Sequence, residues 1–361
     1  MASFADGKIE AYLGPTELGA ADDLEAVIVE FIGAARSSLD IAVQELDSEP
    51  IAEAIFSARW RGVSVRFFFD QEYLRPRLSA KGLPLQSQNT TERRILTALV
   101  RADVEVQGQF NPRLFHQKFV LRDFRDGKAA KRSKPALLTG SANFTATEMH
   151  ANLNHVFVFN APRVCRQYEA EFAQLQLGRR LHGDVPHLFN LGGVPTKVLF
   201  APEHLPELEI VKQMLKGSKE VCFSIFTFAG SSAIDDTMLS LARGGMAFRG
   251  VVDRGQAAQG WAAPRTMSHA NIRMHAPTKA SGVGKLHHKL MVIDERVVVA
   301  GSFNYTQPGF AFNDENIFVL GSVHAETHGI PVADEQTGAL ARYMKAEIER
   351  IIRDLGEPYV P

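Results

Sequence analysis

Two stretches of the chain repeat one pattern of polar residues that could act together on a charged group. The later stretch, Leu286–Thr306, contains the pattern H-x-K-x4-D-x6-G-S-x-N. The earlier copy keeps this order but has sixteen residues, instead of six, between the aspartate and the glycine. The repeated positions are His116, Lys118, Asp123, Ser141 and Asn143, and then His287, Lys289, Asp294, Ser302 and Asn304.

These residue types suit a phosphate group. Lysine is a strong point-charge donor, and asparagine, serine and main-chain N–H groups add neutral donors, so two copies can hold an oxyanion whose charge is spread over several oxygens. His287 and Lys289 are two residues apart, so both side chains point to one face of an extended strand. One histidine can attack as a nucleophile while the other protonates the leaving oxygen. The two lysines fill the electrostatic role of a divalent ion, so we expect no metal and no other cofactor.

A blander explanation exists for each residue taken singly. A lone histidine before a strand is more often a core or surface residue, and a lone Gly-Ser-x-Asn is more often a turn. The ordered repeat of the whole set favours the chemical interpretation. His287-His288-Lys289 does not predict a metal site, because no cysteine or further histidine stands at ligand spacing.

The doubled motif resembles the hallmark of the phospholipase D superfamily, and the resemblance covers most of the chain because the flanking segments repeat as well. It implies phosphodiester hydrolysis or transfer through a covalent phosphohistidine, without a metal. It also implies an α/β fold of two pseudo-twofold-related halves, each a mixed β-sheet flanked by helices on both faces. The active site would lie at the interface of the halves.

The segments around the motifs predict the same division. Gly62, Arg66 and Asp70 recur as Gly245, Arg249 and Asp253, each 183 residues later. An internal repeat of this length indicates duplication, and alternating strand and helix patterns indicate an α/β sheet. Residues 177–195 contain several glycines and prolines and are typical of a linker. We therefore expect an N-terminal half, 1–184, and a C-terminal half, 185–361.

Periodicity gives an outline of the elements in the first half. Ile9–Leu13 is expected as a short edge strand, and further strands are expected at 39–46 and 63–69. Helices are expected at 22–37, 50–61 and 91–101, and a loop at 71–90. Each half is expected to close with a helix, near 164–175 and 336–355.

The extra residues of the first copy, Phe124–Thr139, predict a protruding loop in place of a tight turn. Its basic residues are Arg125, Lys128, Lys131, Arg132 and Lys134. A short charge run is by default a solvated loop. Because this loop joins the strands that carry His116 and Asn143, we also consider it as a phosphate-backbone clamp beside the active site, which favours a polyanionic substrate.

The two copies differ again after the asparagine. Fourteen residues beyond the glycine stands Glu315 in the second copy and Asn154 in the first. The resemblance implies that a glutamate here orients the motif histidine, so we expect Glu315 beside His287 and Asn154 beside His116. A carboxylate favours the imidazolium, which makes His287 the expected general acid and His116 the expected nucleophile. A carboxylate can also strengthen a nucleophile by holding its tautomer.

The motif aspartates have a different expected role. The resemblance implies that Asp123 and Asp294 are structural and lie away from the phosphate. We expect turn-capping carboxylates at both positions.

Composition narrows the class of protein. The 361 residues are 45% hydrophobic and 22% charged, with a formal net charge of −1, so no global basic field indicates nucleic acid. Cys165 and Cys222 are far apart on apolar segments and are expected as reduced thiols, which fits a cytoplasmic protein. The N-terminal residues show no signal peptide, and no stretch predicts a transmembrane helix.

Three functions agree with the motif. We favour a metal-independent nuclease that cleaves DNA or RNA, because the chain has a basic loop and no sign of secretion or membrane anchoring. The first alternative is a phospholipase D or phosphatidyltransferase, and the second is a non-catalytic nucleic-acid-binding scaffold. Both motifs lie in one chain, so a monomer is sufficient for one active site, and a homodimer could regulate access. The sequence leaves DNA against RNA, strandedness, and endo against exo cleavage undecided.

Overall fold

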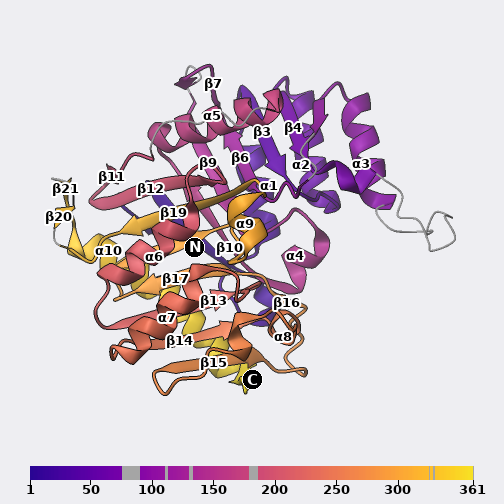
Figure 1. The fold of residues 1–361 in the computed structure, drawn as a ribbon. Helices are drawn as coiled ribbons and strands as arrows, with labels where there is room; N and C mark the ends of the chain where they lie inside the picture. Colours follow the sequence, from indigo (N-terminus) through magenta and orange to yellow (C-terminus); the bar gives the residue numbers. More distant parts are fainter. Residues whose placement is uncertain are drawn as a thin grey trace, which may run out of the picture.

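The computed structural model describes residues 1–74, 90–109, 113–129, 133–178, 186–324, 326–327 and 330–360. Two large mixed β-sheets dominate it. The first sheet, with β3 (Ser38–Val43) and β4 (Ser64–Phe69), lies at the upper right of Figure 1. The second, with β13 (Glu220–Ile225) and β14 (Ala247–Val252), lies toward the lower left.

The first sheet has the order β1-β2-β10-β9-β6-β3-β4-β5. Its other strands are β1 (Ala2–Phe4), β2 (Ile9–Gly14), β5 (Glu105–Gly108), β6 (Lys118–Arg122), β9 (Ala136–Gly140) and β10 (Asn152–Phe159). The helices of this half are α1 (Leu24–Gly33), α2 (Glu49–Trp60), α3 (Thr90–Arg101), α4 (Ala146–His150) and α5 (Pro162–Leu177). A small hairpin, β7 (Phe124–Arg125) and β8 (Lys128–Ala129), lies between β6 and β9.

The second sheet repeats this plan with the order β11-β12-β19-β18-β17-β13-β14-β15-β22. Its other strands are β11 (Phe189–Leu191), β12 (Val194–Ala201), β15 (Ile272–Pro277), β17 (Lys289–Ile293), β18 (Val297–Gly301), β19 (Glu315–Gly321) and β22 (Gly356–Pro358). The helices are α6 (Pro206–Lys216), α7 (Ala233–Arg243), α8 (Arg254–Ala257), α9 (Gln307–Ala311) and α10 (Asp334–Arg350). Two short pieces, β20 (Glu326–Thr327) and β21 (Ile330–Pro331), pair with each other. The strand β16 (Lys285–Leu286) crosses over and pairs with β10 of the first sheet.

Apart from β22, the two sheets therefore have the same strand order. In both, the central strand (β3 or β13) is parallel to one neighbour (β4 or β14) and antiparallel to the other (β6 or β17). The strands that carry the polar motifs are β6 with β9, and β17 with β18. The repeat in the sequence thus corresponds to a repeat in the fold.

Local sequence explains where the first helices begin. The side chain of Asp23 accepts a hydrogen bond from the N–H of Ala26, and that of Ser48 accepts one from Ile51, so each satisfies an end group that the helix leaves without a partner. Pro50 lies in the first turn of α2, where a missing N–H costs nothing.

Three apolar cores hold the layers together. One contains α1, α2 and α3 with the outer face of the first sheet, and another contains α6 and α7 with the outer face of the second. The third joins the inner faces of both sheets to α5 and α10. At its centre Phe157 and Phe318, which are equivalent residues of β10 and β19, touch edge to face with ring centroids 4.8 Å apart. The two halves therefore share one buried interior.

Several element boundaries differ from those expected. The strand at Ile9 is not at an edge, because β1 pairs with its outer side. The end of the expected linker is strand, since β11 begins at Phe189 and pairs with β12. The last helix ends at Arg350 and continues as a π-helical turn, Ile351–Leu355. The expected domain boundary at Asp184 falls outside the described residues.

None of the helices described is both long and apolar enough to cross a membrane.

The two motif aspartates tie loops together at the far ends of the motif strands. Asp123 accepts hydrogen bonds from the main-chain N–H groups of residues 36, 37 and 38, at 2.7–3.1 Å. Asp294 accepts from the N–H groups of residues 218, 219 and 220, at 2.8–2.9 Å. Both therefore cap main-chain groups, as expected, and Asp123 is 1% exposed.

Replacing Asp123 with alanine leaves buried N–H groups without an acceptor, so we expect the free energy of unfolding to fall by about 1–3 kcal/mol. Asp126→Ala is the matched control, because Asp126 is an exposed aspartate of the same hairpin and surface changes usually stay within about 0.5 kcal/mol. Urea unfolding measures both. Equal midpoints in the two variants would contradict the capping role.

Candidate active site

The two motif histidines lie where the halves meet, and main-chain hydrogen bonds hold them there. The N–H of His116 donates to the carbonyl oxygen of Asp314 at 3.0 Å. The N–H of His287 donates to the carbonyl oxygen of Leu153 at 2.9 Å. Each histidine thus precedes a motif strand of its own sheet, while its N–H is bonded to a carbonyl oxygen of the other half, just before β19 or within β10. Both are almost fully buried, at 5% and 4% exposure.

The His116 ring is held by a carboxyl group from the second half. Its Nδ1 lies 2.7 Å from Oε2 of Glu315, and the same oxygen accepts a hydrogen bond from the Ser302 hydroxyl at 2.7 Å. Glu315 is fully buried. With Nδ1 engaged, Nε2 is the ring atom available for chemistry.

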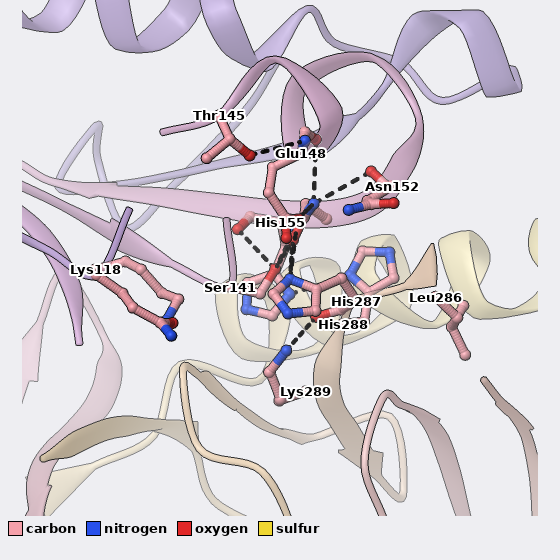
Figure 2. Close-up of polar contacts among 12 residues, drawn as sticks. Lys118, Ser141, Thr145, Glu148, Asn152, His155, Leu286, His287, His288 and Lys289 are labelled. Carbon is pink, nitrogen blue, oxygen red and sulfur yellow. Dashed lines mark hydrogen bonds and ion pairs between the residues drawn. The ribbon is translucent and has the colours of Figure 1, made fainter. Parts of the chain in front are cut away.

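The His287 ring is held in the same way by the first half, through two side chains. Its Nδ1 lies 3.0 Å from Oε2 of Glu148 and 3.1 Å from Oδ1 of Asn154. The amide of Asn154 donates to Glu148 at 2.6 Å and its oxygen accepts from the Ser141 hydroxyl at 2.7 Å. Figure 2 shows this group, with Glu148 and Ser141 approaching His287 from the first half.

The expected pairing of each histidine within its own copy is therefore wrong. Glu315 partners His116, and Asn154 partners His287, because β10 and β19 begin at the interface and direct their first side chains across it. Sequence reasoning also missed Glu148. It lies in the short helix α4, and its equivalent in the second half is Gly309, so the repeat gave no signal for it. The Thr145-x-x-Glu148 helix start was the only local hint.

The two serines serve the histidine partners. Ser141 and Ser302 donate to Asn154 and Glu315, so they orient those side chains and are not directed at the site as phosphate donors. Asn143 and Asn304 each have a buried Oδ1 that lacks a hydrogen-bond partner among the described residues.

The two motif lysines are buried at 1% and 2% exposure. The ammonium of Lys118 donates to the carbonyl oxygen of His116 and, at 3.2 Å, to Oε1 of Gln44. That of Lys289 donates to the carbonyl oxygen of His287 at 2.7 Å. Neither forms a direct ion pair with a carboxylate among the described residues, so each has capacity left for an anion.

Burial sets the protonation of this cluster. It lowers the pKa of Lys118 to about 8, and burial together with the charge of Lys118 lowers the pKa of Lys289 well below its usual value. Burial also lowers the pKa of His116 strongly, and lowers that of His287 to about 4 although the charge of Glu148 acts in the opposite direction. Positive charge is unfavourable here until an anion binds. Burial removes water from the cations, and the low dielectric strengthens the repulsion between them.

The two carboxyl groups differ in charge. Burial raises the pKa of Glu315 to about 8. The pKa of Glu148 falls to about 2: burial raises it, but His287, Asn154 and Lys289 lower it by more. The imidazole of His287 therefore faces a firmly ionised carboxylate, whereas His116 faces a carboxyl group whose charge burial opposes.

The two sides of the site differ at one further equivalent position. After β3, Gln44 contacts Lys118, while after β13 the ring of Phe226 lies 4.9 Å from the Lys289 ammonium and 4.8 Å, edge to face, from the His287 ring. Exposed Lys285 also approaches the Phe226 ring, at 5.9 Å. On the other side, the guanidinium of exposed Arg113 lies 4.7 Å from the Phe312 ring. An aromatic ring thus lies against His287, and the Arg113–Phe312 pair joins the chain segments that precede His116 and Asp314.

The described basic residues of the loop, Arg125, Lys128 and Lys134, lie toward the end of β6 opposite Lys118, so they do not support a clamp at the active site. Lys118 begins β6 and the loop follows its other end, about 13 Å away at the rise of a strand. Arg125 is bonded to the buried carboxylate of Asp40 and to Ser64. The other basic residues of the loop, Lys131 and Arg132, lie outside the described residues.

Over the described part of the chain, no three or more His, Cys, Asp or Glu side chains form a group that could hold a metal ion. The positive charge at the site comes from the two lysines. The arrangement can therefore bind a phosphate group between two imidazoles, each with one ring nitrogen directed by an acid or amide of the other half.

Comparisons with known proteins agree with this arrangement. A family model described as "Cardiolipin synthase, PLD-like domain" matches residues 28–176 and 210–329. The mitochondrial cardiolipin hydrolase of Danio rerio is 26% identical over 149 residues, which are 41% of this chain and 55% of that protein. The aligned part spans about half the length of the curated relatives.

Two solved structures share the fold over 99% of this chain. The phosphatidylserine synthase of Haemophilus influenzae Rd KW20 matches with a TM-score of 0.67 and 11% identity, over 88% of its own chain. The polyphosphate kinase of Porphyromonas gingivalis matches with a TM-score of 0.63 and 14% identity, over 50% of its chain. At these identities the likeness shows the fold alone.

Anion binding should draw protons into the site. At pH 8 about half of Lys118 is unprotonated, given its pKa of about 8. A bound dianion raises that pKa, so tungstate, which carries no proton at this pH, should bind with uptake of protons. Calorimetry in two buffers of different ionisation enthalpy measures the uptake.

Lys118→Met should abolish this binding. The anion-free protein should be as stable or more stable, because the substitution removes a buried charge that no carboxylate neutralises by direct contact. Lys128→Met is the matched control, since that lysine is exposed and lies toward the other end of β6, and it should retain the uptake. Tungstate binding without proton uptake in the wild-type protein would contradict the protonation states given above.

Proposed function

The chain belongs to the phospholipase D superfamily and is a phosphodiesterase of that fold, and we propose that it is a metal-independent nuclease that acts on DNA or RNA through a phosphohistidine. The observation that carries this proposal is the pair of buried imidazoles. Each is bonded at Nδ1 by a carboxyl group of the opposite half, and each lies next to a buried lysine.

The reaction proceeds in two steps. Nε2 of His116 attacks phosphorus, the bond from phosphorus to the leaving oxygen breaks, and that oxygen takes the proton from Nε2 of His287. Water then attacks the phosphohistidine and gives a proton back to His287, and the N–P bond breaks. Lys118 and Lys289 stabilise the charge that develops on the oxygens outside the bond being broken.

The charge of the partner decides the two roles. An ionised carboxylate stabilises an imidazolium, and Glu148 keeps its charge beside His287 while burial opposes the charge of Glu315. His287 is accordingly the general acid and His116 the nucleophile. This keeps the roles expected from the sequence but assigns them to different partners.

Two features near the site favour a nucleic acid as substrate. The Phe226 ring lies against His287 and has Lys285 beside it, and the Phe312 ring has Arg113 beside it, on the segments that precede Asp314 and His116. Bases stack on aromatic side chains and cations follow the backbone, and this combination is common in single-strand binding sites. A phospholipid substrate is the second candidate, supported by the relatives named for cardiolipin.

Removing either imidazole should abolish turnover. We expect His116→Ala and His287→Ala to lose at least about 10³-fold in kcat on an oligonucleotide, because each removes one partner of a proton or phosphoryl transfer. The wild-type enzyme should keep its activity in excess EDTA. Loss of activity in EDTA, restored by one particular metal ion, would contradict a reaction that depends on the lysines alone.

The covalent intermediate can be trapped. His287→Ala, given bis(p-nitrophenyl) phosphate, should release p-nitrophenolate in a burst of one equivalent per enzyme, because this leaving group needs no acid but hydrolysis needs the base. Mass spectrometry should find the phosphoryl group on His116. A phosphoryl group on His287 in His116→Ala would reverse the two roles.

The substrate class can be decided by direct comparison. Single-stranded and duplex DNA, RNA, and vesicles of phosphatidylcholine and cardiolipin are incubated with enzyme in EDTA. We expect cleavage of nucleic acid. Cleavage of lipid alone would contradict the nuclease proposal and favour a phospholipid substrate.

The exposed cations Arg113 and Lys285 should account for part of the salt dependence of nucleic-acid binding. Arg113→Gln with Lys285→Gln should reduce the slope of log K against log salt by about 1–2, at about 0.7 per phosphate contact on a single strand. Lys128→Gln with Lys134→Gln, at the other end of the strands, is the matched control and should leave the slope unchanged. A lower slope for the Lys128 and Lys134 variant, with no change for the Arg113 and Lys285 variant, would show that the basic loop binds nucleic acid.

A further inference from the structure

Two aspartates at equivalent places in the halves hold the residue that precedes each catalytic histidine. Asp70 follows β4, and its Oδ2 accepts a hydrogen bond from the N–H of Phe115 at 3.0 Å. Asp253 follows β14, and its Oδ2 accepts from the N–H of Leu286 at 3.0 Å. Phe115 and Leu286 stand directly before His116 and His287.

The second oxygen of each carboxylate is also in use. Oδ1 of Asp70 accepts from the N–H of Glu72 at 2.9 Å, and Oδ1 of Asp253, the N-cap of α8, accepts from the N–H of Gln256 at 2.9 Å. Both aspartates are buried, at 0% and 8% exposure. One oxygen of each carboxylate is therefore fixed by a neighbouring turn, and the other holds the residue before the motif histidine.

The N–H of the next residue points the opposite way. The N–H groups of His116 and His287 donate to carbonyl oxygens of the other half, at Asp314 and Leu153. Successive main-chain groups are thus held by one half and then by the other. Two consecutive anchors fix the main chain at the histidine, and through it the direction of the ring.

We propose that Asp70 and Asp253 are positioning residues, which set the places of His116 and His287 respectively for reaction. This inference rests on the proposed function for its kinetic consequences. Neither aspartate touches the phosphate in this role. Each acts through the main chain, so its loss displaces a ring that its partners Glu315 or Glu148 must still reach across the interface.

Asp70→Asn and Asp253→Asn weaken the hydrogen bonds to the main chain with little change in side-chain size. An amide has one accepting oxygen, so one of the two N–H groups at each site would face an NH₂ group instead. We expect kcat to fall about 10- to 100-fold, since a misplacement on the order of 1 Å has that effect. Asp123→Asn and Asp294→Asn are the matched controls, because they also remove a duplicated capping carboxylate, but away from the site.

A comparison of leaving groups separates positioning from general loosening of the fold. With an oligonucleotide the leaving oxygen needs a proton, and with bis(p-nitrophenyl) phosphate it does not. The comparison uses the rate of the first step, the burst of leaving group, because the later hydrolysis needs His287 with either substrate. Asp253→Asn, which displaces the acid His287, should slow this step mainly with the oligonucleotide. Asp70→Asn, which displaces the nucleophile His116, should slow it equally with both. The reverse selectivity would support positioning and exchange the roles of the rings.

A second readout does not depend on activity. In protein labelled with ¹⁵N-histidine, Asp70→Asn should shift the ring signals of His116, and Asp253→Asn those of His287, while both controls leave them in place. Variants that match the controls in kinetics and ring signals would overturn the inference while leaving the nuclease proposal intact. A wild-type protein that cleaves neither substrate, but whose ring signals move as described, would overturn the proposed function and keep the positioning.

Discussion

A hydrogen bond from each motif imidazole to a carboxyl group of the opposite half is the constraint on which the site depends. The His116 ring is bonded by Glu315 and the His287 ring by Glu148, so the ring of each histidine depends on a side chain of the other half. The shared core around Phe157 and Phe318 holds the halves in the register that these bonds require. The active site exists only where the two halves are in contact, and that contact is continuous with the apolar interior.

Burying four cationic or potentially cationic groups is expensive, and the pKa directions show the cost. Both imidazoles and both ammonium groups have lowered pKa values before an anion binds. A phosphate group reverses this, because it supplies the negative charge that the cluster lacks. The site is therefore organised for the substrate at the expense of the stability of the empty protein, and the remaining structure must compensate through packing.

Much of the architecture could be read from the chain before any coordinates. The repeated motif and the offset shared by Asp70 and Asp253 indicated two similar halves, and the apolar runs indicated the strands around Lys118 and Lys289. The expectations about which residues lie close together in space were less successful. The basic loop was expected beside the site because it joins two motif strands, but a hairpin places its loop at the end of the strands opposite the residues that begin them.

The sequence by itself determined the chemical groups, their duplication and the strands that carry them, because these depend on residue type and short-range spacing. Only the tertiary structure decided which carboxyl group meets which imidazole. Glu148 and Glu315 reach their histidines from the other half, over separations of 139 and 199 residues along the chain. Spacing along the chain carries no information about such contacts, since they are set by how two sheets pack across a shared core.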